Sequence, residues 1–298
     1  MTVQHNIPMT PANAAPSPLV DFWNDILAPK FIRFRHVLVG GLSRHSEAVF
    51  PRLGVEPGMR ILDVGCGFGD TAIQLASATG SKGEVLGVDC CQAFLDHAWH
   101  AAELMWVPNI RFACRDVELG IDEPPFDMVF ARFGTMFFAN PVAGLRAMRA
   151  CLKPGGKMAH IVWRQRADNP WLIAARDIVQ HFLPAPGEGA VTCGPGPFSM
   201  ADEEVTRAQM KAAGFIDIAF ERIDAKVEVG RDVADAIAFQ LAIGPAGETF
   251  REAGELGEQR RPEIEAALGE MFEGVIAREG GLWMDSSSWL ITARSPAA

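Results

Sequence analysis

Three glycines stand close together in the segment ILDVGCGFGD, which runs from Ile61 to Asp70 and begins with a short apolar run. An apolar run of about four to eight residues that ends in glycines is typical of a buried strand followed by a tight turn. Glycines in such a turn let a ligand approach the main chain more closely than a side chain would permit. The segment therefore predicts a strand, a glycine-rich turn and a helix that together border a ligand.

Apolar runs and helix-like patterns alternate through the middle of the chain. The apolar runs lie at residues 60–64, 84–88, 110–114, 126–131 and 157–163. Helix-like spacing of apolar residues occupies 71–78, 93–104 and 141–152. Strands that alternate with helices form a parallel sheet with helices on both faces. We therefore expect an α/β fold with a doubly wound, mostly parallel, Rossmann-like sheet.

The remainder of the chain extends this sheet and adds helices. Strands are expected at 216–229 and 289–293, which brings the sheet to seven strands. The apolar phase of the first of these shifts by one residue, which predicts a bulge or bend near Arg222. Helical patterns occupy 18–53, 171–182, 201–213 and 231–279.

These patterns divide the chain into segments. We expect a flexible tail at 1–17, N-terminal helices that cover the site at 18–54, and a cofactor-binding core at 55–165. A cap insertion is expected at 166–200 and a helical cap insertion at 231–285, with the rest of the sheet at 201–230 and 286–298.

Charge and composition exclude several classes of partner. The 298 residues include 27 basic and 37 acidic side chains, a formal charge of −10, which disfavours nucleic acid. No uncharged apolar run reaches about 18 residues and residues 1–17 do not resemble a signal peptide, so we expect no membrane span and a cytoplasmic location. The six cysteines lack metal-ligand spacing, so no metal is expected. The absence of tyrosine excludes a tyrosine base.

Two carboxylates indicate the kind of ligand. Asp70 stands where the dinucleotide fingerprint GxGxxG has its last glycine, which weakens a nicotinamide-binding interpretation. Its charge at a helix N-terminus disfavours a phosphate there and favours a cationic or zwitterionic ligand. Asp89 ends the second apolar run, 20 residues after Gly69, where a carboxylate can accept hydrogen bonds from both ribose hydroxyls of an adenosine.

The series of motifs resembles one enzyme family. ILDVGCGFGD resembles the first motif of class I S-adenosylmethionine-dependent methyltransferases, and VLGVD at 85–89 resembles the second. CRDVE at 114–118, FDMVFARFG at 126–134 and LKPGGKM at 152–158 resemble the motifs at the next three strands. The resemblance covers about residues 55–165. It is strongest to the small-molecule branch that includes the ubiquinone/menaquinone-biosynthesis C-methyltransferases.

The resemblance implies S-adenosylmethionine as cofactor, S-adenosylhomocysteine as product, and a role for each matching residue. Gly65 and Gly67 would line the methionine part, and Asp63 would support the loop or reach the amino group through water. Asp89 would bind the ribose, and the main-chain carbonyl of Arg132 would contact the amino group. The side chain of Arg132 departs from the family, where the residue is small or polar. Phe94 would lie against the adenine, and Asp116 would accept a hydrogen bond from its exocyclic amine, with the main chain of Val117 nearby. Cys90 is a further cofactor-binding candidate.

Methyl transfer from a sulfonium is an in-line displacement from an activated donor, so the protein mainly aligns the reactants and excludes water. A base helps when the acceptor loses a proton, and His160 and His36 are weak candidates for that role. Aromatic residues expected near the ends of the strands suggest an acceptor pocket. These residues are Trp23, Phe133, Phe137 and Trp163.

The expected function is therefore methyl transfer to a small apolar or aromatic acceptor. Two alternatives stay open at this point. The chain could bind the cofactor without turnover, or it could be a nicotinamide-dependent oxidoreductase, which the residue at position 70 disfavours. The sequence does not fix the acceptor, the methylated atom or the oligomeric state, for which a homodimer is one arrangement.

Overall fold

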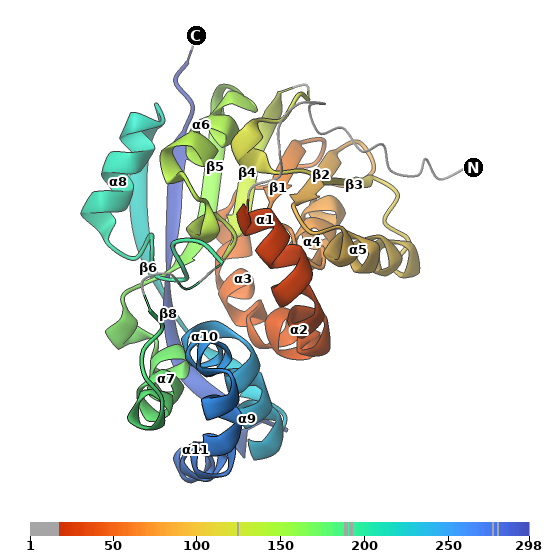
Figure 1. The fold of residues 1–298 in the computed structure, drawn as a ribbon. Helices are drawn as coiled ribbons and strands as arrows, with labels where there is room; N and C mark the ends of the chain where they lie inside the picture. The colour runs from red at the N-terminus through yellow and green to blue at the C-terminus, as the bar shows by residue number, and fades with distance from the viewer. Residues whose placement is uncertain are drawn as a thin grey trace.

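The computed structural model describes residues 18–123, 125–187, 190, 193–275, 277–278 and 280–297, so the predicted tail at 1–17 lies outside the described residues. One mixed sheet with helices on both faces forms the centre of the molecule (Figure 1). Its strands have the order β3-β2-β1-β4-β5-β8-β6, and a two-residue strand, β7, pairs with β8. The strands are β1 (Arg60–Val64), β2 (Glu84–Asp89), β3 (Ile110–Cys114), β4 (Phe126–Arg132), β5 (Leu152–Trp163), β6 (Ile216–Gly230), β7 (Ala277–Arg278) and β8 (Gly281–Arg294).

The first five strands are parallel, and β8 runs antiparallel to both β5 and β6. Crossovers through α4 (Asp70–Thr79), α5 (Gln92–Leu104) and α6 (Pro141–Ala150) connect the parallel strands. This arrangement confirms the predicted seven-stranded, mostly parallel, doubly wound fold. It also brings the carboxyl ends of β1, β2 and β4 to one edge, where open α/β sheets bind ligands.

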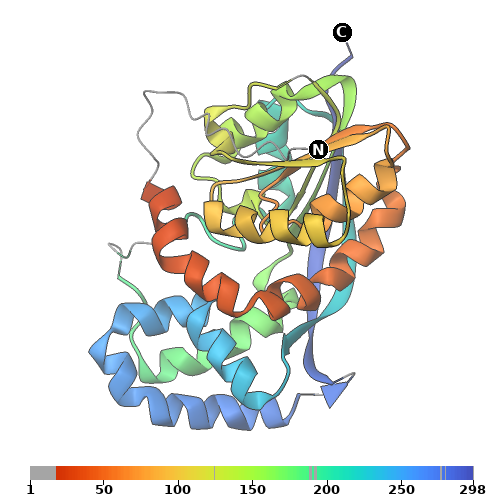
Figure 2. The same cartoon turned by 90° about the vertical axis from the view of Figure 1, so that its right-hand side faces the viewer.

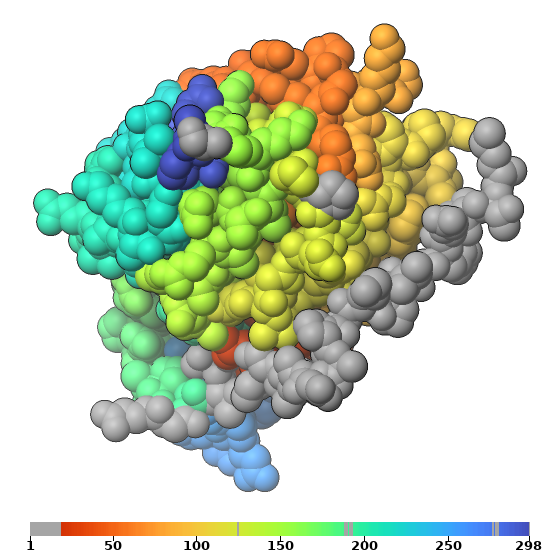
Figure 3. All heavy atoms as spheres, turned by 90° about the horizontal axis from the view of Figure 1, so that it is seen from above, coloured from red at the N-terminus to blue at the C-terminus, as the bar shows by residue number. Residues whose placement is uncertain are grey.

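Alternate strand residues fill two separate layers of the core. Ile61 and Phe130 pack in the layer that contains the apolar side chains of α4 and α5. Leu62 and Val129 pack in the opposite layer with Leu145 of α6. Because these strands are covered on both faces, their sequence is continuously apolar rather than alternating. Seen from above, α8 (Glu203–Ala212), α6 and the segment from β1 to β4 form one continuous surface (Figure 3).

A long hairpin of β6 and β8 differs from the prediction in two respects. The β6–β8 register is regular from Ala219 to Glu228 and shifts between Ile216 and Ala219, so the strand has no bulge at Arg222, and its irregularity lies nearer the start of β6. The apolar phase shifts because the covered face changes: α8 packs near the start of β6, and α3 (Ser43–Val49) packs farther along it. Strand β8 begins at Gly281, eight residues before the strand predicted at 289–293.

The far ends of β6 and β8 carry a lobe of four helices that pack against one another (Figures 1 and 2). They are α7 (Pro170–Phe182), α9 (Val233–Ala242), α10 (Gly244–Ala253) and α11 (Glu255–Glu273). None of the helices in the described part of the chain has the length and apolar character that crossing a membrane requires.

The N-terminal helices run between this lobe and the sheet (Figure 2). They comprise α1 (Pro18–Phe22), η1 (Trp23–Leu27), α2 (Ala28–Arg33), η2 (His36–Gly41), α3 and η3 (Phe50–Arg52). Phe34 is fully buried against Phe239 of α9, whereas Phe31 packs against Phe94 of α5. This segment therefore contacts both parts of the molecule.

Candidate functional site

A cavity of about 200 Å³ lies at the carboxyl ends of β1, β2 and β4. Its polar side is formed by the glycine turn and by acidic residues, and its apolar side by the N-terminal helices and the segment after β4. The lining residues that the argument below uses are Trp23, Phe31, Leu38, Leu42, Gly65, Gly67, Phe68, Asp70, Thr71, Asp89, Cys90, Phe94, Arg115, Asp116, Val117, Glu118, Arg132, Phe133, Phe137 and Phe138. The first part of the chain and the predicted core thus meet at one cavity.

The glycine turn after β1 needs glycine for two different reasons. Gly65 and Gly67 have φ values of 65° and 53°, in the left-handed region that favours glycine. A Cβ on Gly65 would approach Cα of Gly134 at 3.1 Å, so the turn packs closely against the segment after β4. A Cβ on Gly67 would meet no heavy atom within 4 Å. The main chain at Gly67 is therefore open to the cavity.

Asp89 holds the glycine turn and the start of α5 together. One carboxylate oxygen accepts a hydrogen bond from the main-chain N–H of Gly67 at 2.9 Å, and the other accepts one from that of Cys91 at 2.9 Å. Burial raises the pKa of Asp89 to about 6, against the lowering effect of these bonds. A second lone pair on each oxygen leaves Asp89 able to accept further hydrogen bonds from a ligand.

Asp63 lies on β1 beneath the turn and is fully buried. Its Oδ2 accepts a hydrogen bond from the hydroxyl of Thr71 at 2.7 Å, whereas its Oδ1 has no partner among the described residues. Burial raises the pKa of Asp63 to about 7. A buried acceptor without a partner costs free energy unless a ligand supplies a donor or a positive charge nearby.

The predicted adenine-binding residues gather at the ends of β2 and β3. Phe94 is buried and packs against Phe68, with ring centroids 4.9 Å apart. Oδ1 of Asp116, a residue of the cavity lining, accepts a hydrogen bond from the main-chain N–H of Glu118 at 3.0 Å. Cys90 and Val117 complete this group, and burial raises the pKa of the Cys90 thiol.

The apolar side of the cavity is built from aromatic contacts. Trp23 meets Phe31 and Phe137 edge to face, at centroid distances of 5.2 and 5.0 Å, and its indole N–H donates to the carbonyl of Cys193 at 3.3 Å. Leu38 and Leu42 line the same side. The sequence patterns pointed to Trp23 but not to these leucines. The sequence does contain one indication of these leucines: residues 37–42 hold no charged or polar side chain, which is unusual for a helix with a solvent-exposed face.

Phe133 and Trp163 form a stacked pair behind the cavity wall. Their ring centroids are 3.8 Å apart and the ring planes differ by 13°. Phe133 adopts a left-handed conformation with φ of 56°, which is rare for a bulky residue and marks a strained position. Phe133 lines the cavity, whereas Trp163 lies behind it and is not among the lining residues.

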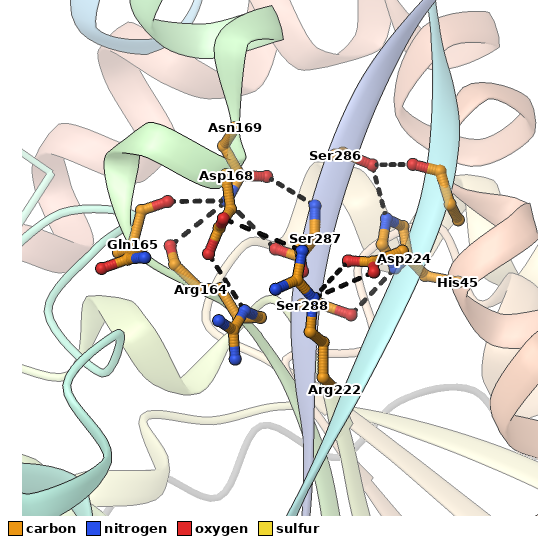
Figure 4. Close-up of polar contacts among 11 residues, drawn as sticks. His45, Arg164, Gln165, Asp168, Asn169, Arg222, Asp224, Ser286, Ser287 and Ser288 are labelled. Carbon is orange, nitrogen blue, oxygen red and sulfur yellow. Dashed lines mark hydrogen bonds and ion pairs between the residues drawn. The ribbon is translucent and has the colours of Figure 1, made fainter.

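His45 supports this pair from a fully buried position between two serines of β8 (Figure 4). The hydroxyl of Ser286 donates to the carbonyl of Ala225 at 2.6 Å, so it accepts from the Nε2–H of His45 at 2.8 Å. The Nδ1 of His45 then accepts from the hydroxyl of Ser288 at 2.8 Å. Burial, and next the charge of Arg132, lower the pKa of His45 to about 4, so the ring is neutral.

The chain after Trp163 is held to β8 by hydrogen bonds with the main chain of Ser287, which lies between the two serines that contact His45 (Figure 4). The buried amide of Asn169 donates to the carbonyls of Arg164, Gln165 and Ser287 at 3.0–3.2 Å, and it accepts from the N–H of Ser287 at 3.1 Å. Asn169 therefore sets where α7 leaves the sheet.

Neither histidine predicted as a base lines the cavity. His160 is fully buried in β5, where its Nδ1 lies 3.1 Å from the hydroxyl of Thr135 and burial lowers its pKa to about 3. His36 lies 2.7 Å from a carboxylate oxygen of Asp235, between the N-terminal helices and α9. Both histidines thus have polar partners, Thr135 and Asp235, that lie outside the cavity lining.

Arg132 follows β4 and its side chain makes an ion pair that the sequence patterns missed. Its guanidinium lies 2.7 Å from a carboxylate oxygen of Asp70 and donates to the hydroxyl of Ser46 at 2.8 Å. The partners come from β4, α4 and α3, so spacing along the sequence could not connect them. All three residues meet at the polar end of the cavity.

Comparison with known proteins identifies the core of the chain. Residues 61–156 match the family model described as a methyltransferase domain. The chain carries a methyltransferase domain. The match begins in β1, includes the glycine turn and ends in β5, and it confirms the resemblance drawn from the motifs of the sequence.

The methyltransferase domain is similar to two curated enzymes. Demethylmenaquinone methyltransferase of Staphylococcus aureus is 37% identical over 134 residues, 44% of this chain and 54% of that protein. The ubiquinone/menaquinone biosynthesis C-methyltransferase of Ectopseudomonas mendocina is 29% identical over 208 residues, 66% of this chain and 81% of that protein. The chain thus spans about half the length of the first of these relatives.

Solved structures share the fold of the whole chain around this methyltransferase domain. Phosphoethanolamine N-methyltransferase 2 of Haemonchus contortus, in complex with S-adenosyl-L-methionine, has a TM-score of 0.55 and 19% identity, and the match covers 96% of this chain and 61% of that one. The YcgJ protein of Bacillus subtilis has a TM-score of 0.54 and 14% identity, covering 86% and 99%. At these identities the likeness concerns the fold.

A resident metal has no visible ligand set in this methyltransferase domain. Within the described ranges, no three side chains of histidine, cysteine, aspartate or glutamate are grouped so that they could hold a metal ion.

Proposed function

We propose that this protein transfers a methyl group from S-adenosylmethionine to a small, apolar, aromatic acceptor by in-line displacement. The observation that carries the proposal is the two-sided cavity, in which a glycine turn with carboxylates faces a wall of aromatic and aliphatic side chains. The methyltransferase domain match and the named relatives support the same reaction class.

The residues of the polar side fit this cofactor. Asp89 would accept hydrogen bonds from the ribose hydroxyls, and Asp116, with the main chain of Val117, would bind the adenine beside Phe94. The glycine turn would hold the methionine part, with Gly67 open to it. The unpaired Oδ1 of Asp63 suits a cationic neighbour, directly or through water.

When bound, S-adenosylmethionine supplies a methyl group on a positively charged sulfur, so the donor is already activated. In the proposed transfer the methyl carbon would bond to the nucleophilic atom of the acceptor as the carbon–sulfur bond breaks with its electron pair left on sulfur, and the proton that the acceptor then releases would pass to solvent water. The protein then has to align the two partners and exclude water, which the apolar side of the cavity can do. Aromatic rings such as Trp23 also present faces that attract a cation.

The acceptor class follows from the aromatic wall and from the absence of a histidine among the described lining residues. Among the described residues no histidine lines the cavity, so an acceptor activated by its own ring substituents is favoured. The two relatives are named for demethylmenaquinone and for ubiquinone and menaquinone biosynthesis. We propose an aromatic ring that carries hydroxyl groups, such as a quinol, as the acceptor.

The proposed acceptor is a small molecule rather than a nucleic acid, in keeping with the formal charge of −10. A cytoplasmic location and a homodimer stay predictions, and so does the division of the chain into core and cap segments.

The test is an assay with methyl-labelled S-adenosylmethionine and three acceptors: a naphthoquinol with a short side chain, a monocyclic phenol and phosphoethanolamine. We expect label on an aromatic acceptor. The variant Asp89→Ala should weaken cofactor binding at least tenfold, about 1.4 kcal/mol. The matched control is Asp285→Ala, which removes an exposed carboxylate paired only with Lys226 in the described contacts and should leave binding unchanged.

Three outcomes would contradict the proposal. Binding of S-adenosylhomocysteine without transfer to any acceptor would indicate a protein that binds the cofactor without turnover. Tight binding of NADH in place of S-adenosylmethionine would favour an oxidoreductase. Unchanged affinity in both Asp89→Ala and Asp89→Asn would show that the ribose binds elsewhere.

A further inference from the structure

The polar end of the cavity contains an arginine whose side chain has no role in the proposed reaction so far. Arg132 and Asp70 are largely buried, with side-chain exposures of 9% and 17%, and form an ion pair at 2.7 Å. Both residues line the cavity beside Gly65 and Gly67. A paired arginine at this place is either a structural contact between α4 and β4 or part of a binding site for a charged group.

The distribution of charge distinguishes these two roles. The acidic residues that line the cavity are Asp70, Asp89, Asp116 and Glu118, and the buried Asp63 lies beneath the turn. The basic residues of the lining are Arg115 and Arg132. Arg115 follows β3 and lies 4.0 Å from Glu123. At the glycine turn, Arg132 is therefore the one cationic side chain among the described lining residues.

The methionine part of S-adenosylmethionine carries an α-ammonium and an α-carboxylate. The carboxylates around the glycine turn favour the ammonium and would repel the carboxylate, because opposite charges attract and like charges repel in a poorly hydrated site. A guanidinium has five N–H donors, and the contacts with Asp70 and Ser46 leave others to bind a carboxylate. Arg132 thus supplies the positive charge and the N–H donors that the α-carboxylate of the cofactor otherwise lacks at this end of the cavity.

We propose that the guanidinium of Arg132 binds the α-carboxylate of the cofactor and that Asp70 faces its α-ammonium. This inference rests on the proposed function and adds a specificity for the amino acid part of the cofactor. Before binding, Asp70 and Ser46 hold the guanidinium in place, so little side-chain freedom is lost when the ligand arrives. The contact with Ser46 also joins the N-terminal helices to this end of the cavity.

The test compares the affinities of S-adenosylmethionine and decarboxylated S-adenosylmethionine, which differ only in the carboxylate. Wild-type protein should prefer the complete cofactor. Arg132→Met should lower the affinity for S-adenosylmethionine by about 10- to 100-fold, the range of a hydrogen bond to a charged group, and change the affinity for the decarboxylated ligand less than about twofold. Isothermal titration calorimetry measures both.

Two further variants separate the proposal from a merely structural ion pair. Arg222→Met removes a half-exposed arginine that pairs with Asp224 outside the cavity, and both affinities should stay at the wild-type value. Asp70→Asn should lower the affinity for both ligands, because both carry the ammonium group. Arg132→Lys keeps the positive charge but lacks the planar, forked set of N–H donors. It should therefore lose less affinity for S-adenosylmethionine and none for the decarboxylated ligand, and it replaces Arg132→Met in the test if that variant does not fold.

An equal loss of affinity for both ligands in Arg132→Met and Arg132→Lys would overturn the proposal, because it would mean that the arginine only supports the glycine turn. Unchanged affinity for S-adenosylmethionine would overturn it as well. Failure of wild-type protein to bind either ligand would instead contradict the proposed function, and this inference with it.

Discussion

Two buried carboxyl groups beneath and beside the glycine turn make the site sensitive to pH. Burial raises the pKa of Asp63 to about 7 and that of Asp89 to about 6, both above the range of an exposed aspartate. A carboxyl whose pKa is raised on folding stabilises the protein below its unfolded pKa, and this contribution is lost as pH rises through the folded pKa. The unliganded protein should therefore lose stability between about pH 4 and pH 7, where a cationic ligand would offset the cost.

The variant Asp63→Asn isolates this effect because it keeps an oxygen for Thr71 and cannot ionise. We expect the free energy of unfolding of the variant, relative to wild type, to increase by about 2 kcal/mol between pH 5 and pH 8. Denaturant unfolding at the two pH values measures the difference. The control Asp285→Asn changes an exposed carboxylate and should show no such trend. A difference that does not vary with pH would show that Asp63 does not ionise in this range.

At the scale of elements, the turn between β1 and α4 fits against the end of β4 with little space. The Cβ that Gly65 lacks would lie 3.1 Å from Gly134, whereas the Cβ that Gly80 lacks, at the other end of α4, would meet nothing within 4 Å. Both glycines have φ of 65°. Both therefore lie at a φ that L side chains rarely adopt, and they differ in what a new Cβ would touch.

This pair allows strain and site geometry to be separated. Gly65→Ala and Gly80→Ala should each destabilise the fold by about 1–2 kcal/mol, since alanine is strained at this φ. Only Gly65→Ala should also weaken S-adenosylhomocysteine binding, by at least about tenfold, about 1.4 kcal/mol. Thermal melting and calorimetry measure the two effects. Equal affinities in the two variants would mean that the turn does not hold the ligand.

The elements also show which parts of the structure the sequence could predict. The five parallel strands follow from apolar runs bounded by glycines and charged residues, and the cavity residues of the glycine turn and of Asp89 follow from their place at strand ends. The early start of β8 did not follow, because the consecutive serines from 286 to 288 resemble a polar loop. They lie buried in the strand because His45 and the carbonyl of Ala225 satisfy two of their hydroxyls.

The partner of Arg132 was also beyond the sequence patterns. The sequence marks Arg132 as a departure from the family and Asp70 as a charge at the start of a helix, but it does not connect the strand of one with the helix of the other. Their contact depends on the packing of the β1–α4 turn against the end of β4, where Gly65 and Gly134 meet. A contact of this kind is set by the tertiary structure and leaves no periodic signal.

At the scale of the whole molecule, the N-terminal helices connect the ligand cavity with the helical lobe. They line the cavity through Trp23 and Leu38 and contact α9 through Phe34 and His36. Polar fastening to the core includes the amide of Asn24, which donates to the carbonyl of Cys90 at 3.2 Å. A ligand held between these helices and the glycine turn should stabilise residues 18–42 more than the lobe.

Hydrogen–deuterium exchange checks this expectation. Saturating S-adenosylhomocysteine should slow amide exchange at least about threefold in residues 18–42 and in the turn from 65 to 70, because local opening then requires loss of the ligand. Peptides from α11 should exchange at the same rate with and without ligand. Equal slowing throughout the chain would indicate that opening is global, and no change in 18–42 would contradict a covering role for these helices.

The hairpin that carries the helical lobe has a consequence for how this fold can vary. Gly230 at the end of β6 pairs with Leu282 at the start of β8, so the chain leaves the sheet and re-enters it at neighbouring positions. A segment whose two ends are already adjacent can be lengthened, shortened or exchanged at little entropic cost, and without shifting any strand register. A chimaera that exchanges residues 231–280 would keep the lining residues of the cavity named above, and its new insert would have to cover the face of α7 that packs against α10.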